Sequence, residues 1–153
     1  MIFRLTAAAV IEKESRFLLV EERAQGRVVL NTPSGRWETG DRSLADTAIR
    51  EAAEEAGVIF VPAFFLGSYV ATHTSLTGQP ICTVRFAFGG TVTQGVPDVA
   101  RDASILGCHW LTLEQVLAQR ALHRSSAVMR CIEDHMAGRN YSLDAVKQMD
   151  DNK

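Results

Sequence analysis

Two apolar runs near the N-terminus are separated by a short polar stretch. The runs span Leu5–Ile11 and Phe17–Val20, and the polar residues between them are Glu12–Arg16. Apolar runs of this length on either side of a polar turn predict a β-hairpin. A shorter run, Val28–Leu30, precedes a loop of proline, serine and glycine, and it predicts a further short strand.

The segment Leu44–Ala56 has the spacing and the end signals of a helix. Ser43 is a favourable N-cap, Asp46 lies three residues later near the positive end of the helix dipole, and Gly57 follows the last turn. One face carries the small and apolar residues that we expect to be buried: Ala45, Ile49, Ala52 and Ala56. The sequence therefore predicts a helix over Leu44–Ala56.

The second half of the chain begins with two strand patterns. Val58–Ala71 predicts one strand, or two strands that are broken at Pro62. The stretch "ICTVRFAFGGTV", Ile81–Val92, alternates cleanly and places Arg85 on the face that we expect to lie outside the core.

A short strand, Cys108–Leu111, precedes two further predicted helices. Thr112 is the predicted N-cap of the first helix, with Gln115 at the third position, and the second helix ends at Gly138. Because strands and helices are mixed rather than strictly alternating, the predicted class is α/β (α+β) with a mixed β-sheet.

Length and composition indicate one globular domain. The chain has 153 residues, of which 46% are hydrophobic and 22% are charged. We expect a single domain over residues 1–145 and a polar tail, residues 146–153, that frays. The formal net charge of -2 gives no reason to expect binding to nucleic acid or to an acidic membrane.

The chain shows no secretory or membrane pattern. No apolar segment is long enough to span a bilayer, and the N-terminal residues lack the layout of a signal peptide. The cysteines Cys82, Cys108 and Cys131 are odd in number and widely spaced, which argues against a disulfide framework or a zinc site. We expect buried thiols in a reducing cytoplasm.

Acidic residues crowd the end of the predicted helix, in the run "REAAEEAG". Glu51, Glu54 and Glu55 fall within a wedge about 100° wide, with Arg50 expected to face away from it. Like charges at i,i+4 and negative charge in a last turn both destabilise a helix. A hard divalent cation would remove both penalties because it takes carboxylate oxygens. The alternative is a solvated acidic face without function.

The stretch "GRWETGDRSLADTAIREAAEEAGV", Gly35–Val58, resembles the signature of the Nudix hydrolase family, G-x5-E-x7-R-E-U-x-E-E-x-G-U, in which U is aliphatic. The second half, Arg50–Val58, fits position by position, with Ala52 smaller than the usual aliphatic residue. The order of the later segments is similar to that of NudJ-type bacterial members. The resemblance covers nearly the whole chain and implies an α/β/α sandwich.

The first half of the signature departs from the family pattern. If Gly35 is the motif glycine, the sixth residue after it is Asp41 rather than Glu, and counting back from Arg50 places Arg42 at the glutamate position. The loop Arg36–Arg42 therefore has one extra residue. In the family this glutamate braces the motif arginine, so the resemblance implies that Asp41 or Glu38 braces Arg50.

The resemblance implies Mg²⁺-dependent hydrolysis of a pyrophosphate bond in a nucleoside di- or triphosphate or a related organic pyrophosphate, with Mn²⁺ as an alternative ion. Glu51 and Glu55 would be metal ligands, Glu54 a ligand or the base that activates water, and Arg50 part of the catalytic set. The backbone carbonyl near Ser34–Gly35 would add a further metal ligand.

Many members of the family have another carboxylate in a later loop. The corresponding position, six residues before Trp110, holds Ser104, so Asp102 is the nearest replacement and Asp98 lies behind it. Asp102 is therefore a candidate catalytic residue, and the alternative is a solvated loop aspartate.

Cationic side chains should hold the phosphates. Arg85 is the best candidate because an arginine on an apolar strand needs a partner, although a structural ion pair would also explain it. Arg36 is a further candidate, with Arg23 and Arg27 weaker. Trp37 either stacks on a base or packs at the rim of the core.

Two other functions remain open at this point. A nucleotide-binding sensor of the same fold without catalysis would not need all three glutamates, and an isomerase would need a catalytic pair that the sequence does not reveal. The expected partner is a small phosphorylated molecule, and a homodimer is a further expected assembly.

Overall fold

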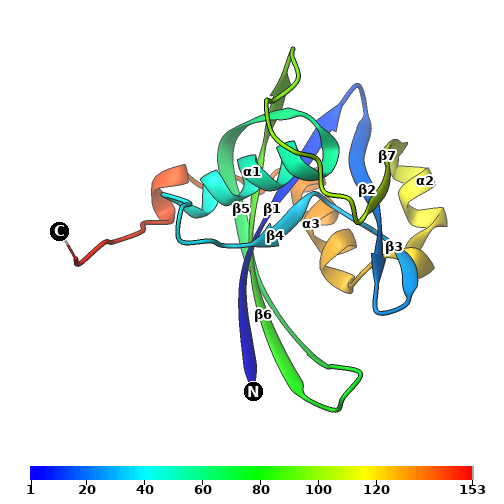
Figure 1. The fold of residues 1–153 in the computed structure, drawn as a ribbon. Helices are drawn as coiled ribbons and strands as arrows, with labels where there is room; N and C mark the ends of the chain where they lie inside the picture. Colours follow the sequence, from blue (N-terminus) through cyan, green and yellow to red (C-terminus); the bar gives the residue numbers. More distant parts are fainter. Residues whose placement is uncertain (153) are drawn as a thin grey trace.

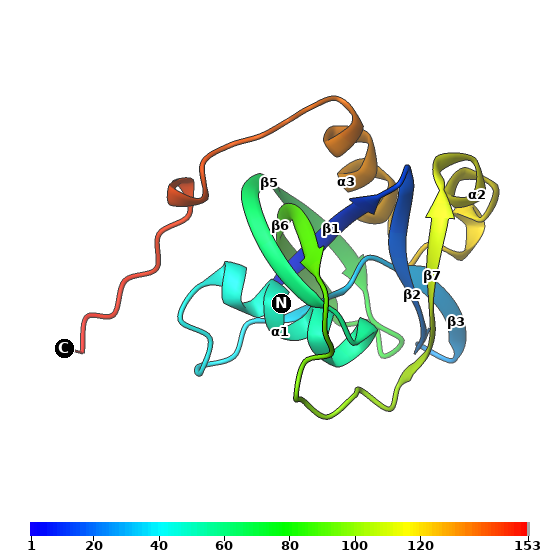
Figure 2. The ribbon, with the colours of Figure 1, turned by 90° about the horizontal axis from the view of Figure 1, so that it is seen from above.

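The computed structural model describes residues 1–152 and contains one mixed sheet with helices on both sides (Figures 1 and 2). The elements in chain order are β1 (Ile2–Lys13), β2 (Arg16–Ala24), β3 (Arg27–Asn31), β4 (Ser34–Arg36), α1 (Leu44–Ala56), β5 (Ile59–Thr74), β6 (Pro80–Thr93), β7 (Ile105–Thr112), α2 (Leu113–Ala118), α3 (Ser126–Met136), and two short 3₁₀ turns, Arg120–Leu122 and Leu143–Ala145.

Strand β1 lies at the centre of the sheet. It pairs in parallel with β6 and antiparallel with β4, while β5 continues the sheet beyond β6. Strand β2 joins the end of β1 and pairs antiparallel with β3 and with β7. The predicted mixed α+β class is confirmed.

The core lies in two layers, one on each side of the sheet. Ala7, Ala9 and Ile11 of β1 pack in the layer that includes α1, whereas Ala8 and Val10 pack in the layer that includes α3. A strand that is buried on both faces has a continuous apolar run, which explains the sequence of this part of β1. Figure 2 shows α1 and α3 on opposite sides of the strands.

The helix predictions agree closely with the structure. Helix α1 begins after the N-cap Ser43, whose side chain accepts from the Asp46 backbone N–H, and it ends at Gly57, where φ is 66°. A left-handed backbone here suits glycine. Thr112 and Gln115 form the predicted capping box of α2.

The strand predictions need small changes. β5 is a single strand with irregular pairing on both sides of Phe64, so Pro62 bends it without ending it.

Helix α3 ends at Met136, two residues before Gly138. The predicted tail begins with residues that contact the domain, because Val146 packs against the α1 layer and the Gln148 side chain donates to the Asp41 carbonyl at 3.2 Å.

No helix within residues 1–152 is both long and apolar enough to cross a membrane.

Candidate active site

The carboxylates of the acidic run are not a solvated helix face. Glu51 is 8% exposed and Glu55 only 4%. Burial raises the pKa of the Glu51 carboxyl to about 7 and that of the Glu55 carboxyl to about 9. Glu55 accepts one hydrogen bond, from the Ser34 backbone N–H at 2.8 Å. Two buried acids one helical turn apart are a feature that stability alone does not explain.

Gly35 lies directly against the Glu51 carboxylate. A Cβ atom at this position would overlap the Glu51 side chain. Glycine suits this position because β4 passes so close to α1 that a side chain would push the Glu51 carboxylate aside. This contact places the backbone of Ser34–Gly35 beside the acidic residues, as the sequence led us to expect.

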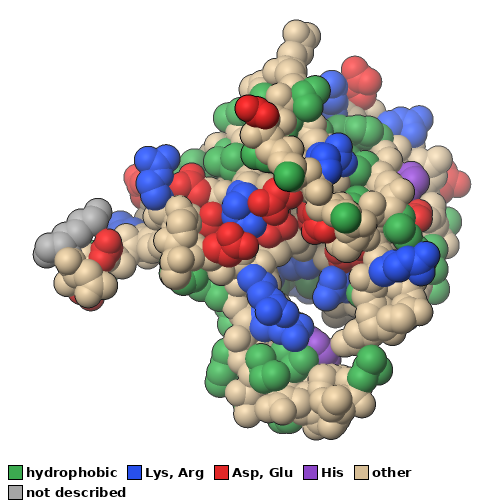
Figure 3. All heavy atoms as spheres, viewed as in Figure 1, with side chains coloured by type: hydrophobic (Ala, Val, Ile, Leu, Met, Phe, Trp, Pro, Cys, Tyr) green, Lys and Arg blue, Asp and Glu red, His purple; other side chains and the backbone are tan. Residues whose placement is uncertain are grey.

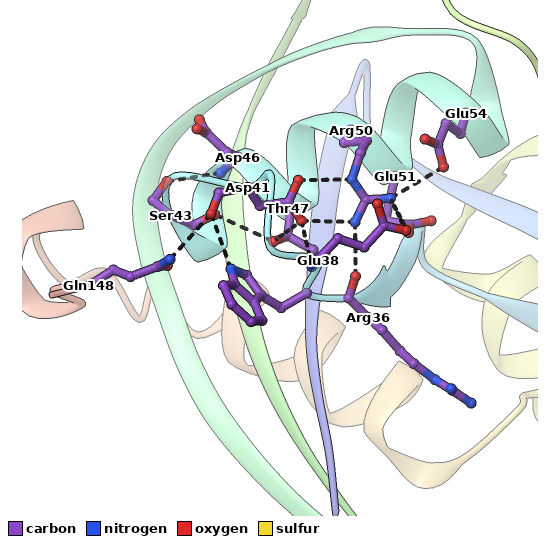
Figure 4. A network of polar contacts seen from close by, with 11 residues as sticks. Arg36, Glu38, Asp41, Ser43, Asp46, Thr47, Arg50, Glu51, Glu54 and Gln148 are labelled. Carbon is purple, nitrogen blue, oxygen red and sulfur yellow. Dashed lines mark hydrogen bonds and ion pairs between the residues drawn. The ribbon is translucent and has the colours of Figure 1, made fainter. Parts of the chain in front are cut away.

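Arg50 is braced by Asp41. The guanidinium donates from Nε to Asp41 Oδ1 and from Nη2 to Oδ2, both at 2.9 Å, and also from Nη2 to the Arg36 carbonyl (Figure 4). Glu38 lies farther from Arg50, at 3.6 Å, and its side chain is exposed. Of the two braces considered, Asp41 therefore makes the closer pairing, and the arginine lowers the pKa of its carboxyl.

The loop with the extra residue folds around Asp41. The Asp41 carboxylate accepts from the Glu38 backbone N–H and from the Thr47 hydroxyl, at 3.0 and 2.8 Å. Its carbonyl accepts from the Trp37 indole N–H, at 3.2 Å. The shorter aspartate reaches Arg50 because the loop turns its backbone toward the start of α1.

The expectation that Arg50 faces away from the acidic residues is wrong. Its Nη1 donates to Glu51 Oε1 at 2.8 Å and lies 3.4 Å from Glu54 Oε2 (Figure 4). Within residues 1–152, no group of three or more His, Cys, Asp or Glu side chains is arranged to hold a metal ion. The Glu54 contact is long and its two side chains are only partly buried, so it restrains Glu54 only weakly.

The loop before β7 is fixed to the end of α1. The Asp102 backbone N–H donates to the Glu54 carbonyl at 2.8 Å, and Arg101 donates to the carbonyls of Glu54 and Glu55 at 3.3 and 3.0 Å. Asp102 accepts from the backbone N–H and hydroxyl of Ser104. This arrangement brings Asp102 close enough to raise the pKa values of Glu51 and Glu55, although burial remains the larger cause.

A cleft of about 560 Å³ runs beside β4. Its acidic side chains come from β2, α1 and the loop before β7: Glu22, Glu51, Glu55 and Asp102. Its arginines come mainly from the strands: Arg4, Arg27, Arg36, Arg85 and Arg124. Figure 3 shows acidic side chains gathered over α1 and cationic side chains around a hollow below them. A larger hollow of about 960 Å³ lies between β5 and α3, and the α1 carboxylates do not line it.

The sequence candidates fall into two groups. Gly35, Arg36, Glu51, Glu55, Arg85 and Asp102 line the cleft. Glu54, Arg50 and Trp37 are not among the lining residues: Arg50 lies in the network with Asp41, and Trp37 packs against the α1 layer. Asp98 and Arg23 also lie outside the lining.

Arg85 does not lie outside the core, where the strand pattern placed it, and within residues 1–152 it does not form the ion pair that was the alternative to phosphate contact. It is 8% exposed, and its guanidinium donates to Thr32 Oγ1 at 3.1 Å and to Asn31 Oδ1 at 3.0 Å. The strand alternation gave the correct face for Arg85, but α3 and β3 cover that face as well.

Four candidate site residues were not identified from the sequence: Arg4, Glu22, Arg101 and Arg124. Arg4 is a charged interruption in an apolar strand, the same signal that identified Arg85, whereas Glu22 stands within the charged run Glu21–Arg23 and gave no such signal. Arg101 and Arg124 lie in loops and gave no sequence signal, since their contacts are with distant elements.

The fold, the buried acids and the arginine-lined cleft define an enzyme of phosphoanhydride chemistry. A family model described as the NUDIX domain matches residues 2–131, and the chain belongs to this family as a Nudix pyrophosphohydrolase. It is 31% identical to phosphatase NudJ of Escherichia coli (strain K12) over 142 residues, covering 93% of this chain and 89% of that protein.

Solved structures share the fold. A NUDIX hydrolase from Nitrosomonas europaea is 37% identical with a TM-score of 0.85, covering 97% of this chain and 99% of that one. The NUDIX domain of Shewanella oneidensis NrtR, solved in complex with ADP ribose, is 20% identical with a TM-score of 0.67, covering 90% and 89%. The predicted family and the α/β/α sandwich are confirmed.

Proposed function

We propose that this enzyme hydrolyses a pyrophosphate bond in a nucleoside di- or triphosphate, or in a related organic pyrophosphate, and that it requires Mg²⁺. One observation carries the proposal: buried Glu51 and Glu55 face a cleft whose other walls carry five arginines. A substrate with linked phosphates would match the arginines, and a cation would match the carboxylates.

The acidic residues fit a hard divalent cation by their chemistry. Glu51 and Glu55 would hold it, with Glu54, Asp102 and the Gly35 carbonyl as further oxygen donors, and Mn²⁺ is the alternative ion. Burial raises the pKa values of Glu51 and Glu55 more than the contacts with Arg50 and with the Ser34 backbone N–H lower them, so a further positive charge would favour the ionised forms. When bound, the ion would polarise phosphoryl oxygens and make a water molecule more acidic.

The chain's own residues orient the substrate and transfer the proton. Arg50, held by Asp41, fixes Glu51 through the hydrogen bond at 2.8 Å. Either Glu54 or Asp102 would accept the proton of the attacking water. Asp102 lines the cleft, whereas Glu54 does not, and the Glu54 side chain is 33% exposed. Arg85 and Arg36 would contact the phosphates.

A panel of phosphoanhydrides tests the function. We expect phosphate or pyrophosphate release with Mg²⁺, no release with excess EDTA, and a loss of about 10² to 10⁴ in kcat for the variant in which the base is removed, Glu54→Gln or Asp102→Asn. Glu114→Gln, an exposed glutamate of α2 outside the cleft, is the matched control and should retain full activity.

The same panel distinguishes the enzyme from a sensor. Tight binding of a nucleotide to the wild-type protein with no turnover of any compound would contradict the proposed function and support a nucleotide-binding role.

We also propose a homodimer through the outer edge of β5. This strand of 16 residues contains no Asp, Glu, Lys or Arg, and within residues 1–152 its outer edge pairs only at Phe65, with Tyr141. Strand edges that do not join a partner usually carry charged residues. Antiparallel pairing of β5 with the same strand of a second copy obeys two-fold symmetry and would cover this edge.

We place the enzyme in the cytoplasm. Cys82, Cys108 and Cys131 are all free thiols in the structure, which suits a reducing compartment.

A further inference from the structure

Three arginines share one face of the sheet beside the cleft. Thr6 of β1 pairs with Arg36 of β4 on one side and with Arg85 of β6 on the other. Arg4 lies two residues before Thr6 on the same strand. Because paired residues and alternate residues of a sheet point to the same face, strand register places the three side chains together. All three line the cleft.

This arginine cluster, Arg4, Arg36 and Arg85, has no acidic partner. Within residues 1–152 none of its members forms an ion pair with an aspartate or glutamate, and Arg85 donates only to neutral acceptors. The Nε atom of Arg4 is buried and has no acceptor. Arg85 is buried, so its charge without a counter-ion is costly, and the unpaired buried donor of Arg4 adds a further penalty.

Neighbouring charges add to the penalty at Arg4. Burial lowers the pKa of this arginine, and the positive charges of Arg36 and Arg124 lower it further. Arg124 also lines the cleft, where its own charge is paired with Glu22 at 2.8 Å. An anion in the cleft would therefore meet three guanidinium groups that no carboxylate neutralises.

The cluster is displaced from the α1 carboxylates. Gly35 of β4 touches Glu51, and the next residue, Arg36, starts the cluster. Arg4 lies about 7 Å farther along β1 than Thr6, the residue that pairs with Arg36. In Figure 4 the Arg36 side chain points away from the Arg50 network, and Arg36 is among the residues that line the cleft.

We propose that Arg4, Arg36 and Arg85 form a second phosphate subsite, which binds a substrate phosphate beyond the bond that is hydrolysed. The proposal rests on the proposed function and narrows its substrate class. It favours compounds with three or more linked phosphates over a diphosphate, because a diphosphate that reaches the α1 carboxylates leaves Arg4 without a partner.

Binding of inorganic tripolyphosphate in metal-free buffer, measured by calorimetry, tests the subsite without turnover. Arg4→Met keeps the length of the side chain and removes the charge, and we expect it to weaken binding at least about tenfold. The exposed Arg36→Met variant should weaken binding in the same direction. Arg23→Met is the matched control, since Arg23 lies on a strand outside the cleft, and it should bind within about twofold of wild type.

Steady-state kinetics provide the second measurement. We expect Arg4→Met to raise KM for a nucleoside triphosphate about tenfold and to leave kcat/KM for a nucleoside diphosphate within twofold. Equal losses for both substrates, or equal losses of tripolyphosphate binding in Arg4→Met and Arg23→Met, would overturn the subsite. Wild-type tripolyphosphate affinity in both Arg4→Met and Arg36→Met, with unchanged thermal stability, would also overturn it.

The two proposals can fail separately. An active enzyme whose Arg4→Met variant behaves like wild type loses the subsite and keeps the proposed function. A protein that hydrolyses nothing but binds tripolyphosphate through Arg4 loses the proposed function and keeps the arginine cluster only as a polyphosphate-binding site.

Discussion

Gly35 is the residue on which the geometry of the acidic site depends most directly. Its α-carbon lies against the carboxylate of Glu51, so that any side chain would displace this acid. Displacement by about 1 Å can lower a rate about 10²-fold when the moved group takes part in catalysis. The same contact also fixes how far β4 stands from α1.

We expect Gly35→Ala to lower kcat by about 10² while the fold remains intact. The measurement is steady-state hydrolysis of the best phosphoanhydride, together with a thermal melt. Gly40→Ala is the matched control, because it lies in the same loop region and a Cβ there would meet no atom within 4 Å. If Gly35→Ala and Gly40→Ala have the same activity, the close approach to Glu51 has no catalytic importance.

At the scale of the element, α1 ends with negative charge in its last turn. No basic residue of the helix lies there. The missing cation comes from the loop before β7, where Arg101 donates to the carbonyls of Glu54 and Glu55 and passes beside Gly57. Cations at a helix C-terminus stabilise it, so Arg101 offsets the unfavourable position of the glutamates.

We expect Arg101→Ala to act on stability and on the site. Because Arg101 is solvent-exposed, its loss should cost only about 0.5–1 kcal/mol, or a few degrees in Tm. Activity should fall more than stability does, because the Asp102 backbone is attached to the same helix end. A thermal melt and steady-state kinetics measure the two effects, and Arg101→Lys should restore part of the activity.

Arg42→Ala is the control for this prediction. Arg42 pairs with Asp46 at the other end of α1, and its side chain is 92% exposed. Its loss should change neither Tm nor kcat appreciably. If Asp102→Asn has no effect on rate, or if Arg101→Ala lowers activity equally in the wild-type and Asp102→Asn backgrounds, then Arg101 does not act through Asp102.

At the scale of the whole molecule, the outer edge of β5 remains open. Val70 is 70% exposed on this strand, and Val61 of the same strand is 43% exposed. An uncharged strand edge beside exposed apolar side chains is a surface that favours pairing with another strand.

We expect the wild-type protein to sediment as a dimer and Val70→Lys to sediment as a monomer, because a charge on the edge opposes pairing. Analytical ultracentrifugation over a range of concentrations measures this. Val96→Lys changes another exposed valine, 83% exposed in the loop after β6, and should remain dimeric. A wild-type protein that stays monomeric at every concentration contradicts the dimer.

Much of the fold could be predicted because its signals are local. Helix α1 was bounded correctly by Ser43 and Gly57, since a cap depends only on residues within one turn. The wedge of Glu51, Glu54 and Glu55 follows in the same way from the 3.6-residue period of a helix. The resemblance to the family rested on this same local stretch.

The contacts of these residues could not be predicted, because they join segments that are distant in the sequence. The sequence left Asp41 and Glu38 as equal candidates to hold Arg50, and the backbone path of the loop favoured Asp41. The guanidinium was placed on the wrong side of the glutamates, since side-chain direction depends on what β4 and the loop leave open.

The burial of Glu51 and Glu55 and the assembly of the arginine cluster depend on sheet register. The spacing of side chains along a helix is fixed by covalent geometry and local hydrogen bonds. The wedge formed by Glu51, Glu54 and Glu55 could therefore be predicted from the sequence. The neighbours of Arg4 are set by how β1 pairs with β4 and β6, and each such pairing depends on the packing of both layers of the core. The acids of the site and two of its cations, Arg36 and Arg85, could therefore be found in the sequence, whereas Arg4 and the grouping of the three arginines became recognisable only once the strands were assembled.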